Sequence, residues 1–283
     1  MHVLQMKLQE FVGAYISHGE DERASNVWIF KPARMSRSRG VIVADNLAVL
    51  VEACTEAIAE HTPAVVSRYV LQPALYQGRK FDLRFVVALR RINPLLLSIY
   101  DGWLVRTADE EYSVEDYANP RKHLTVMQYL DESMGTTCDR AWVRKEQLVQ
   151  NLVSLFGPTC DEKMVKMACH KAILECFSLA TSGIRGAADE LIGIDPNAPH
   201  TQVRGCYGVD VMLRPRTTCT GKQQCPLEPV ILEVNYKPDL RRILQDNWRF
   251  FDELFPVLFG EVSGQATGRS SQAIPNWDSY QSC

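Results

Sequence analysis

The chain has 283 residues, of which 46% are hydrophobic and 23% are charged, and its formal net charge is −3. A chain of this length can bury a substantial core, and we expect two closely packed lobes rather than a short peptide-like module. The nearly balanced charge excludes a globally basic surface, so no nucleic-acid partner is expected. No apolar run approaches the roughly 18 residues that span a bilayer, so no membrane partner is expected either.

Nine irregularly spaced cysteines and the lack of a leader-like start favour reduced thiols and a cytoplasmic location. Residues 1–26 carry a short amphipathic segment and then a polar, loop-like run, and we interpret them as the remnant of an N-terminal lobe or as a linker. Residues 27–30 predict a buried strand and residues 41–43 a second one. Asp45 is expected to cap the helix that follows, which ends before Pro63.

Lys31 stands between the first strand and a loop that contains Arg34, Arg37 and Arg39. A basic loop between strands can lie over phosphate groups, and an exposed basic turn is the alternative interpretation. Residues 64–70 predict a further strand that runs into a break at Gln72 and Pro73.

Further strands are predicted over residues 81–92, 95–100, 103–106 and 123–129, in a largely antiparallel sheet. Lys80, Asp82 and Arg84 alternate with apolar residues and therefore share one face of their strand. A solvated edge strand would explain this pattern, but the apolar run at residues 86–89 favours a central strand whose charged end opens into a cleft. Arg106 is another cation at a strand end.

Helices are predicted over residues 144–156, 164–179 and 248–259, a loop over residues 183–201, and a disordered tail over residues 261–283. Residues 208–213 and 231–235 predict two strands that carry Asp210, Glu233 and Asn235. If these strands pair, three oxygen donors converge, and a hard cation such as Mg²⁺ suits such a set. A satisfied buried glutamate beside an asparagine at a strand end is the alternative.

A basic loop, a strand of mixed charge and an acidic pair together are what a protein needs to hold a nucleoside triphosphate and its Mg²⁺ between two lobes. The chain lacks both the Walker sequence and the glycine-rich loop and His-Arg-Asp set of protein kinases. An internal ion-pair network in a structural scaffold is a third interpretation of the charged strand.

Five short segments of the sequence resemble segments of the tubulin tyrosine ligase-like family and occur in the same order as in that family. The resemblance covers residues 27–260. They are Trp28-Ile29-Phe30-Lys31-Pro32, Lys80-Phe81-Asp82-Leu83-Arg84, Tyr100-Asp101-Gly102-Trp103-Leu104-Val105-Arg106, His123-Leu124-Thr125 and Leu232-Glu233-Val234-Asn235. The resemblance implies an α+β, ATP-grasp-like fold with a mostly antiparallel sheet flanked by helices. It has a central lobe at residues 27–75, a C-terminal lobe at residues 76–260, and an N-terminal lobe that is largely missing.

The same resemblance implies ATP and Mg²⁺ as cofactors and roles for individual residues. The implied nucleotide-binding residues are Lys31, Ser67, Arg68, Tyr69, Val70, Lys80 and Asp82, where residues 67–70 match the hinge beside adenine. The implied metal ligands are Asp210, Glu233 and Asn235. Arg84 and Arg106 match arginines that stabilise acidic substrate groups or the transferring phosphoryl group.

The chain also departs from the family pattern. Val126 stands where active members usually carry asparagine, arginines replace glycines in the loop after Lys31, and Arg214 stands where an acidic residue is common. Two functions therefore remain open. One is a catalytically degenerate scaffold that binds ATP, Mg²⁺ and the acidic C-terminal tail of tubulin or microtubules and regulates tubulin modification. The other is an active ligase that transfers tyrosine, glutamate or glycine to tubulin.

The departures favour the degenerate scaffold, because lost positioning of reactants costs on the order of several powers of ten in rate. A monomer is expected. A cytoplasmic protein associated with the cytoskeleton is expected as well.

Overall fold

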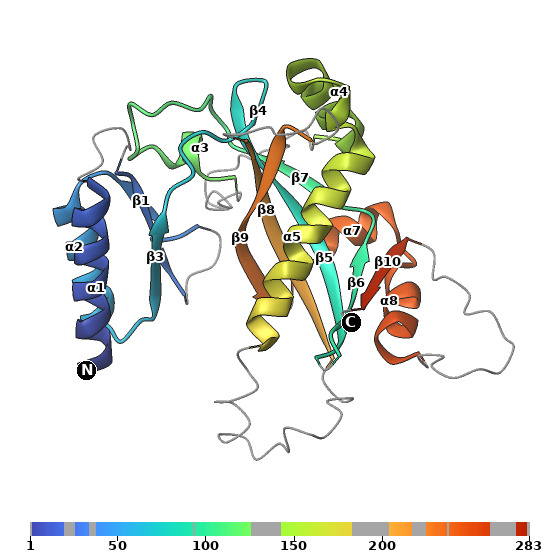
Figure 1. The fold of residues 1–283 in the computed structure, drawn as a ribbon, viewed down its shortest axis with the longest axis horizontal. Helices are drawn as coiled ribbons and strands as arrows, with labels where there is room; N and C mark the ends of the chain where they lie inside the picture. Colours follow the sequence, from blue (N-terminus) through green and yellow to red (C-terminus); the bar gives the residue numbers. More distant parts are fainter. Residues whose placement is uncertain are drawn as a thin grey trace, which may run out of the picture. The chain divides into compact units, whose positions relative to one another are not determined.

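The computed structural model describes residues 2–19, 26–33, 38–92, 94–125, 143–182, 204–216, 225–236, 238–260 and 276–281 (Figure 1). The chain forms two compact units. The first comprises Met1–Phe81 and Arg106–Trp142, and the second comprises Asp82–Val105 and Val143–Cys283. The division into lobes at residues 27–75 and 76–260 stays a prediction.

The first unit is built on a three-stranded antiparallel sheet in the order β2-β1-β3. Two helices pack against it around a cluster that includes the buried side chains of Trp28, Phe30 and Leu50, so the strand-loop-strand-helix order expected from the sequence is confirmed. The elements are α1 (His2–Gly19), β1 (Trp28–Pro32), β2 (Ile42–Ala44), α2 (Leu47–Ala59) and β3 (Ala64–Arg68).

Two local expectations for this unit need correction. Asn46, not Asp45, caps α2: its side chain accepts a hydrogen bond of 2.8 Å from the backbone N–H of Ala48. The reason is that the helix begins at Leu47, and the capping residue directly precedes the first helical residue. In addition, α1 continues to Gly19 and so includes the start of the polar run that predicted a loop.

The larger sheet is antiparallel, with the strand order β10-β6-β5-β8-β9, and β4 and β7 also pair with β5. β5 lies between β6 and β8 and is buried on both faces over most of its length, which confirms the prediction of a central strand. The strands are β4 (Leu75–Tyr76), β5 (Arg79–Arg91), β6 (Leu96–Tyr100), β7 (Leu104–Thr107), β8 (Gly205–Pro215), β9 (Leu227–Tyr236) and β10 (Trp277–Gln281).

Helices cover both faces of this sheet in the second unit. The Phe85 ring of β5 lies 5.6 Å from the His170 ring of α5, whereas the next residue, Val86, packs in a cluster with Phe250 of α8. Since successive strand side chains point to opposite faces, α5 and α8 lie on opposite sides of β5. This arrangement confirms the mixed helix and antiparallel-sheet class. The helices are α4 (Lys145–Phe156), α5 (Glu162–Ser182), α7 (Arg241–Asp246) and α8 (Phe250–Phe259), with the 3-10 turn η2 (Pro158–Cys160).

Two segments differ from the sequence-based expectation. His123 ends a helical turn, α3 (Pro120–His123), instead of starting a strand, because Asn119 caps a turn that proline favours at its first position. Trp277–Gln281, expected in a disordered tail, forms β10, since Trp277 contributes a buried aromatic ring and the strand pairs with β6. The loop expected at residues 183–201 and the rest of the tail lie outside the described residues.

Among the helices that the structure describes, none has both the length and the apolar character needed to cross a membrane.

Candidate functional site

Lys80 lies near the start of β5 in the first unit, and only 2% of its surface is exposed. Its ammonium group donates a hydrogen bond to the Tyr69 hydroxyl and lies 4.1 Å from the centre of the Tyr69 ring. The Tyr112 ring centre is 5.5 Å away. Aromatic faces are electrostatically negative, so they offset part of the cost of burying a cation. Two residues predicted to bind nucleotide, Tyr69 and Lys80, are thus brought together.

His123 extends this cluster by a second hydrogen bond. Because the Tyr69 oxygen accepts from Lys80, its own proton is donated to Nδ1 of His123 over 2.9 Å, and Nε2–H of His123 then donates to the Asp116 carbonyl over 2.8 Å. Burial lowers the pKa of His123, and burial raises the pKa of Tyr69, so both side chains stay neutral near pH 7. His123 lies in the His123-Leu124-Thr125 segment that resembles the family, but it was not among the predicted site residues.

The other predicted nucleotide-binding residues of the first unit have varied environments. Lys31 is half-buried on β1, opposite Val65 of β3. Of the predicted hinge, Ser67 and Val70 are half-buried and Arg68 is exposed. Tyr69 is the hinge residue whose side chain reaches Lys80. The contact of residues 67–70 with adenine stays a prediction.

Asp82 and Arg106 are two further predicted residues that lie outside β8 and β9. Asp82, two residues after Lys80 on β5, is 1% exposed. Arg106 is half-buried on β7. The burial of Asp82 excludes the interpretation of this strand as a solvated edge.

The second unit brings the three predicted metal ligands together. Asp210 on β8 lies directly opposite Glu233 on β9, and Asn235 lies opposite Gly208. The Asn235 amide donates a hydrogen bond of 2.7 Å to Oε1 of Glu233. The sequence predicted that these donors converge if the two strands pair, and β8 and β9 do pair. Because residues two apart on a strand point to the same face, this pairing gathers all three side chains.

The environment of Glu233 contradicts the alternative interpretation of a satisfied buried glutamate. Glu233 is exposed, and Val234 beside it is 40% exposed. The reason is topological: β9 is the last strand in the order of the sheet, so it has a neighbouring strand on one side. A register shift next to Asp210 also interrupts the regular β8–β9 ladder at this point.

Arg84 of β5 adds a fourth side chain to these three, because it lies directly opposite Asp210. Its Nε is 2.6 Å from Oδ1 and its Nη2 is 2.7 Å from Oδ2 of that carboxylate, and the two side chains are 14% and 2% exposed. This two-pronged, charge-assisted contact holds both groups in one plane. We name Arg84, Asp210, Glu233 and Asn235 the carboxylate row.

Gly208 allows the close packing beside this row. A Cβ atom on Gly208 would lie 2.8 Å from Cβ of Pro238 and 3.6 Å from Cδ of Arg84. The first distance is too short for two carbon atoms, so a larger residue at position 208 would push Pro238 away. Glycine thereby keeps β8 close to the segment that follows β9.

The carboxylate row fits a hard cation in its donor chemistry. Two carboxylates and a carboxamide oxygen match Mg²⁺, which keeps several waters and uses few protein ligands. Over the part of the chain that the structure describes, no cluster of three or more His, Cys, Asp and Glu side chains is formed, so a cage made entirely of such residues is absent there. Arg84 already holds both Asp210 oxygens, and a cation at this row would compete with it.

Comparisons with known proteins identify a matching family and related proteins. A family model described as "Tubulin-tyrosine ligase family" matches residues 2–269. The mouse (Mus musculus) protein named tubulin–tyrosine ligase-like protein 12 is 30% identical over 264 residues, which cover 90% of this chain and 37% of the mouse protein. The human protein of the same name is 29% identical over 269 residues, covering 92% of this chain and 38% of the human protein.

A shorter match links the chain to a differently named enzyme. Tubulin glycylase 3D of Tetrahymena thermophila is 37% identical over 107 residues, which cover 38% of this chain and 10% of that protein. The chain spans somewhat more than a third of the length of the mouse and human relatives. The similarity therefore concerns one part of those longer proteins.

Proposed function

The chain belongs to the tubulin-tyrosine ligase family, and on this premise we propose that it is an ATP-grasp-like protein that binds ATP, Mg²⁺ and the acidic C-terminal tail of tubulin without ligating an amino acid itself. In this proposal it regulates the modification of tubulin by active enzymes. Its proposed location is the cytoplasm, in association with microtubules. The names of its relatives support tubulin as the partner.

The observation that carries the proposal is the carboxylate row. Asp210, Glu233 and Asn235 are gathered on one face of β8 and β9, which supports binding of a cation that accompanies phosphate groups. Arg84 holds both oxygens of Asp210, so a metal ion has to displace or share two charge-assisted hydrogen bonds. That competition favours binding over efficient phosphoryl chemistry, which depends on exact placement of the metal and phosphates.

Each proposed role follows from a local environment. Lys80, oriented by Tyr69 and His123, would meet phosphate oxygens with its ammonium group. Asp210, Glu233 and Asn235 would hold Mg²⁺. In active enzymes of this kind, bound ATP supplies the phosphoryl group that activates a carboxylate.

Calorimetry of ATP binding with and without Mg²⁺ tests this proposal. We expect Mg²⁺-dependent binding that weakens at least about tenfold in Glu233→Gln. Glu228→Gln is the matched control, since Glu228 lies on the same strand but pairs with Arg214 instead of joining the row. Binding that is equally strong in Glu233→Gln, or no binding by the wild type, would contradict the proposed site.

Co-sedimentation with microtubules tests the proposed partner. Binding that is lost when the acidic tubulin tails are removed by limited proteolysis would support recognition of the tails. Equal binding to intact and tail-less microtubules, or none to either, would contradict it.

An active ligase is the second candidate, and the retained Lys80 cluster and carboxylate row favour it. The test is incubation with tubulin, ATP, Mg²⁺ and labelled tyrosine, glutamate or glycine. Incorporation of any of the three, lost in Glu233→Gln but kept in Glu228→Gln, would establish the ligase and replace the first proposal.

A further inference from the structure

β10 completes the larger sheet from a distant part of the chain. Its five residues pair in antiparallel register with β6, from Trp277 opposite Tyr100 to Gln281 opposite Leu96. The Asp101 N–H also donates to the Asn276 carbonyl over 2.9 Å. Residues 260–276 separate β10 from α8 in the sequence, so the strand is not placed by a tight hairpin turn from a sequence neighbour. Its position depends on what it contacts.

On the α8 side of the sheet, one aromatic residue anchors β10. Trp277 is 8% exposed and belongs to the cluster of Tyr100 and Phe250, with ring centres 5.3 and 5.8 Å away. Ser279, on the same face two residues later, forms a hydrogen bond of 2.8 Å with Ser98 of β6. Large aromatic rings supply much of the energy at recognition sites.

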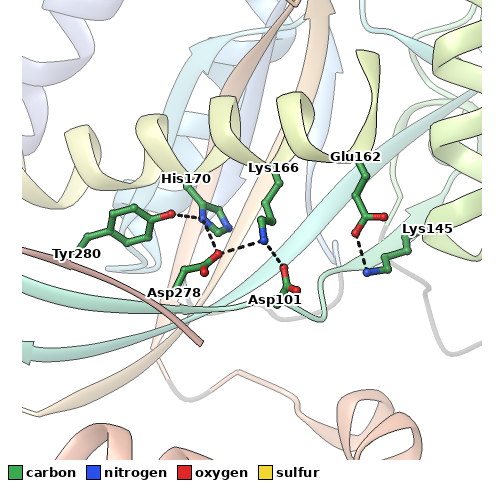
Figure 2. A network of polar contacts seen from close by, with 7 residues as sticks. All are labelled: Asp101, Lys145, Glu162, Lys166, His170, Asp278 and Tyr280. Atoms are coloured by element: carbon green, nitrogen blue, oxygen red, sulfur yellow. Dashed lines mark hydrogen bonds and ion pairs between the residues drawn. The ribbon is translucent and has the colours of Figure 1, made fainter. Parts of the chain in front are cut away.

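On the α5 side, polar groups hold the alternate residues of β10 (Figure 2). Tyr280 forms a hydrogen bond of 2.7 Å with Nδ1 of His170. Asp278 lies 3.1 Å from the ammonium group of Lys166, which also contacts Asp101 at 2.7 Å. Lys166 and His170 are one helical turn apart on α5 and therefore present both contacts from one face.

Lys166 is the charged donor of this network and pairs with two carboxylates. Burial lowers the pKa of Lys166, but its hydrogen bonds to Asp101 and Asp278 outweigh that effect and raise the pKa overall, so the ammonium stays charged. Lys166 thus joins the turn after β6 to β10 through two carboxylates. Such contacts discriminate between strands, because a strand without an aspartate at this position would lose the ion pair with Lys166.

These contacts follow the rules of peptide recognition by strand addition. In that mode the main-chain ladder supplies affinity, and alternate side chains supply specificity in pockets on either face. β10 has the ladder, a tryptophan on one face, and an aspartate and a tyrosine on the other. We define the β10 site as the edge of β6 together with Tyr100, Phe250, Lys166 and His170.

We propose that the β10 site is a peptide-binding site whose resident ligand is this chain's own C-terminal strand, and that the matching strand of a second copy can replace it. The ligand is an extended segment with a tryptophan, an aspartate directly after it, and a tyrosine two residues further on. A second copy is the partner because its C-terminal strand carries the pattern that the site holds here. Exchange between copies would give a strand-swapped dimer.

The test uses the full chain with a specific protease site inserted between Gly264 and Gln265. After folding and cleavage, only non-covalent contacts hold the C-terminal fragment. We expect native mass spectrometry to show the fragment still bound. A fluorescent synthetic peptide of residues 276–281 should then displace it in a saturable way, as measured by anisotropy, whereas a scrambled peptide should not.

Matched variants on α5 separate recognition from general stability. Lys166→Met should weaken peptide binding by about tenfold or more, since it removes the ion pairs with Asp278 and Asp101. Lys171→Met should leave binding unchanged, because Lys171 is exposed and pairs with Glu175 of the same helix. A peptide with Asp278→Asn should lose affinity for the wild type but little for Lys166→Met.

Several outcomes would overturn the proposal. Loss of the fragment without any saturable binding of the labelled peptide would show that there is no peptide site. Unfolding on cleavage, or equal weakening by Lys166→Met and Lys171→Met, would show that β10 is an inseparable part of the core.

Exchange of β10 between two copies is tested by light scattering of the uncleaved chain. It should show dimers that free peptide suppresses, and a monomer at every concentration would refute exchange between copies.

Discussion

Acidification from pH 7 to pH 5 is expected to destabilise the protein through His170. Only 2% of this side chain is exposed. Its pKa is lowered from the usual value of about 6.5 to about 4, mainly because the side chain is buried. The carboxylate of Asp278 has the opposite effect and raises the pKa. Lys166 lowers the pKa further and Asp101 raises it, while Tyr280 contacts Nδ1. The folded chain therefore keeps this imidazole neutral at pH values where an unfolded chain protonates it.

The sign and size of the effect follow from this difference. Because the pKa is lower in the folded state, the unfolded chain binds more protons as the pH falls, and the stability present above about pH 6.5 is lost toward pH 4. A difference of this size corresponds to about 3 kcal/mol in full. At pH 5 the unfolded imidazole is mostly protonated and the folded one mostly neutral, so about 2 kcal/mol of the free energy of unfolding is lost.

Urea unfolding at pH 7, 6 and 5 measures this loss in the wild type and in His170→Asn. The variant is less stable at every pH because it loses packing against Phe85, but its stability should fall by about 2 kcal/mol less between pH 7 and pH 5. Tyr280→Phe keeps the imidazole and should keep most of the wild-type pH dependence. Parallel curves for the wild type and His170→Asn would refute the reasoning.

Three further substitutions test local features by urea unfolding. Asn46→Ala removes the N-cap hydrogen bond of α2 and should lower the free energy of unfolding by about 1 kcal/mol, so an unchanged value would show that the cap contributes nothing. Arg84→Gln leaves Asp210 buried without its guanidinium and should cost about 3 kcal/mol, part of which Asp210→Asn in the same chain should restore; additive losses would contradict the coupling. Gly208→Ala places a methyl group against Pro238 and should cost about 1–3 kcal/mol, whereas wild-type stability would show that this packing gives way easily.

Much of the candidate site was visible in the sequence because short-range periodicity determines which side chains share a strand face. Strict alternation placed Lys80, Asp82 and Arg84 on one face of β5, and the apolar run after them predicted its central position. The two-residue spacing of Glu233 and Asn235 did the same on β9. These predictions need only the geometry of an extended chain.

Other features depended on pairings that no local pattern specifies. The sequence predicted that Asp210 lies with the other metal ligands. The strand register places Arg84 as well as Glu233 directly opposite it. His123 joins Tyr69 across 54 positions of the chain. The exposure of Glu233 likewise follows from the position of β9 in the sheet.

The sequence by itself determined the family, the alternating strands and the residue types that can hold phosphate and a cation. Tertiary structure alone decided that Arg84 holds Asp210, that Lys80 rests on Tyr69, and that residues 277–281 form a strand on β6. The physical reason is that local dihedral preferences and side-chain periodicity act over a few residues. Register, burial and charge pairing between distant segments are decided by the packing of the whole chain.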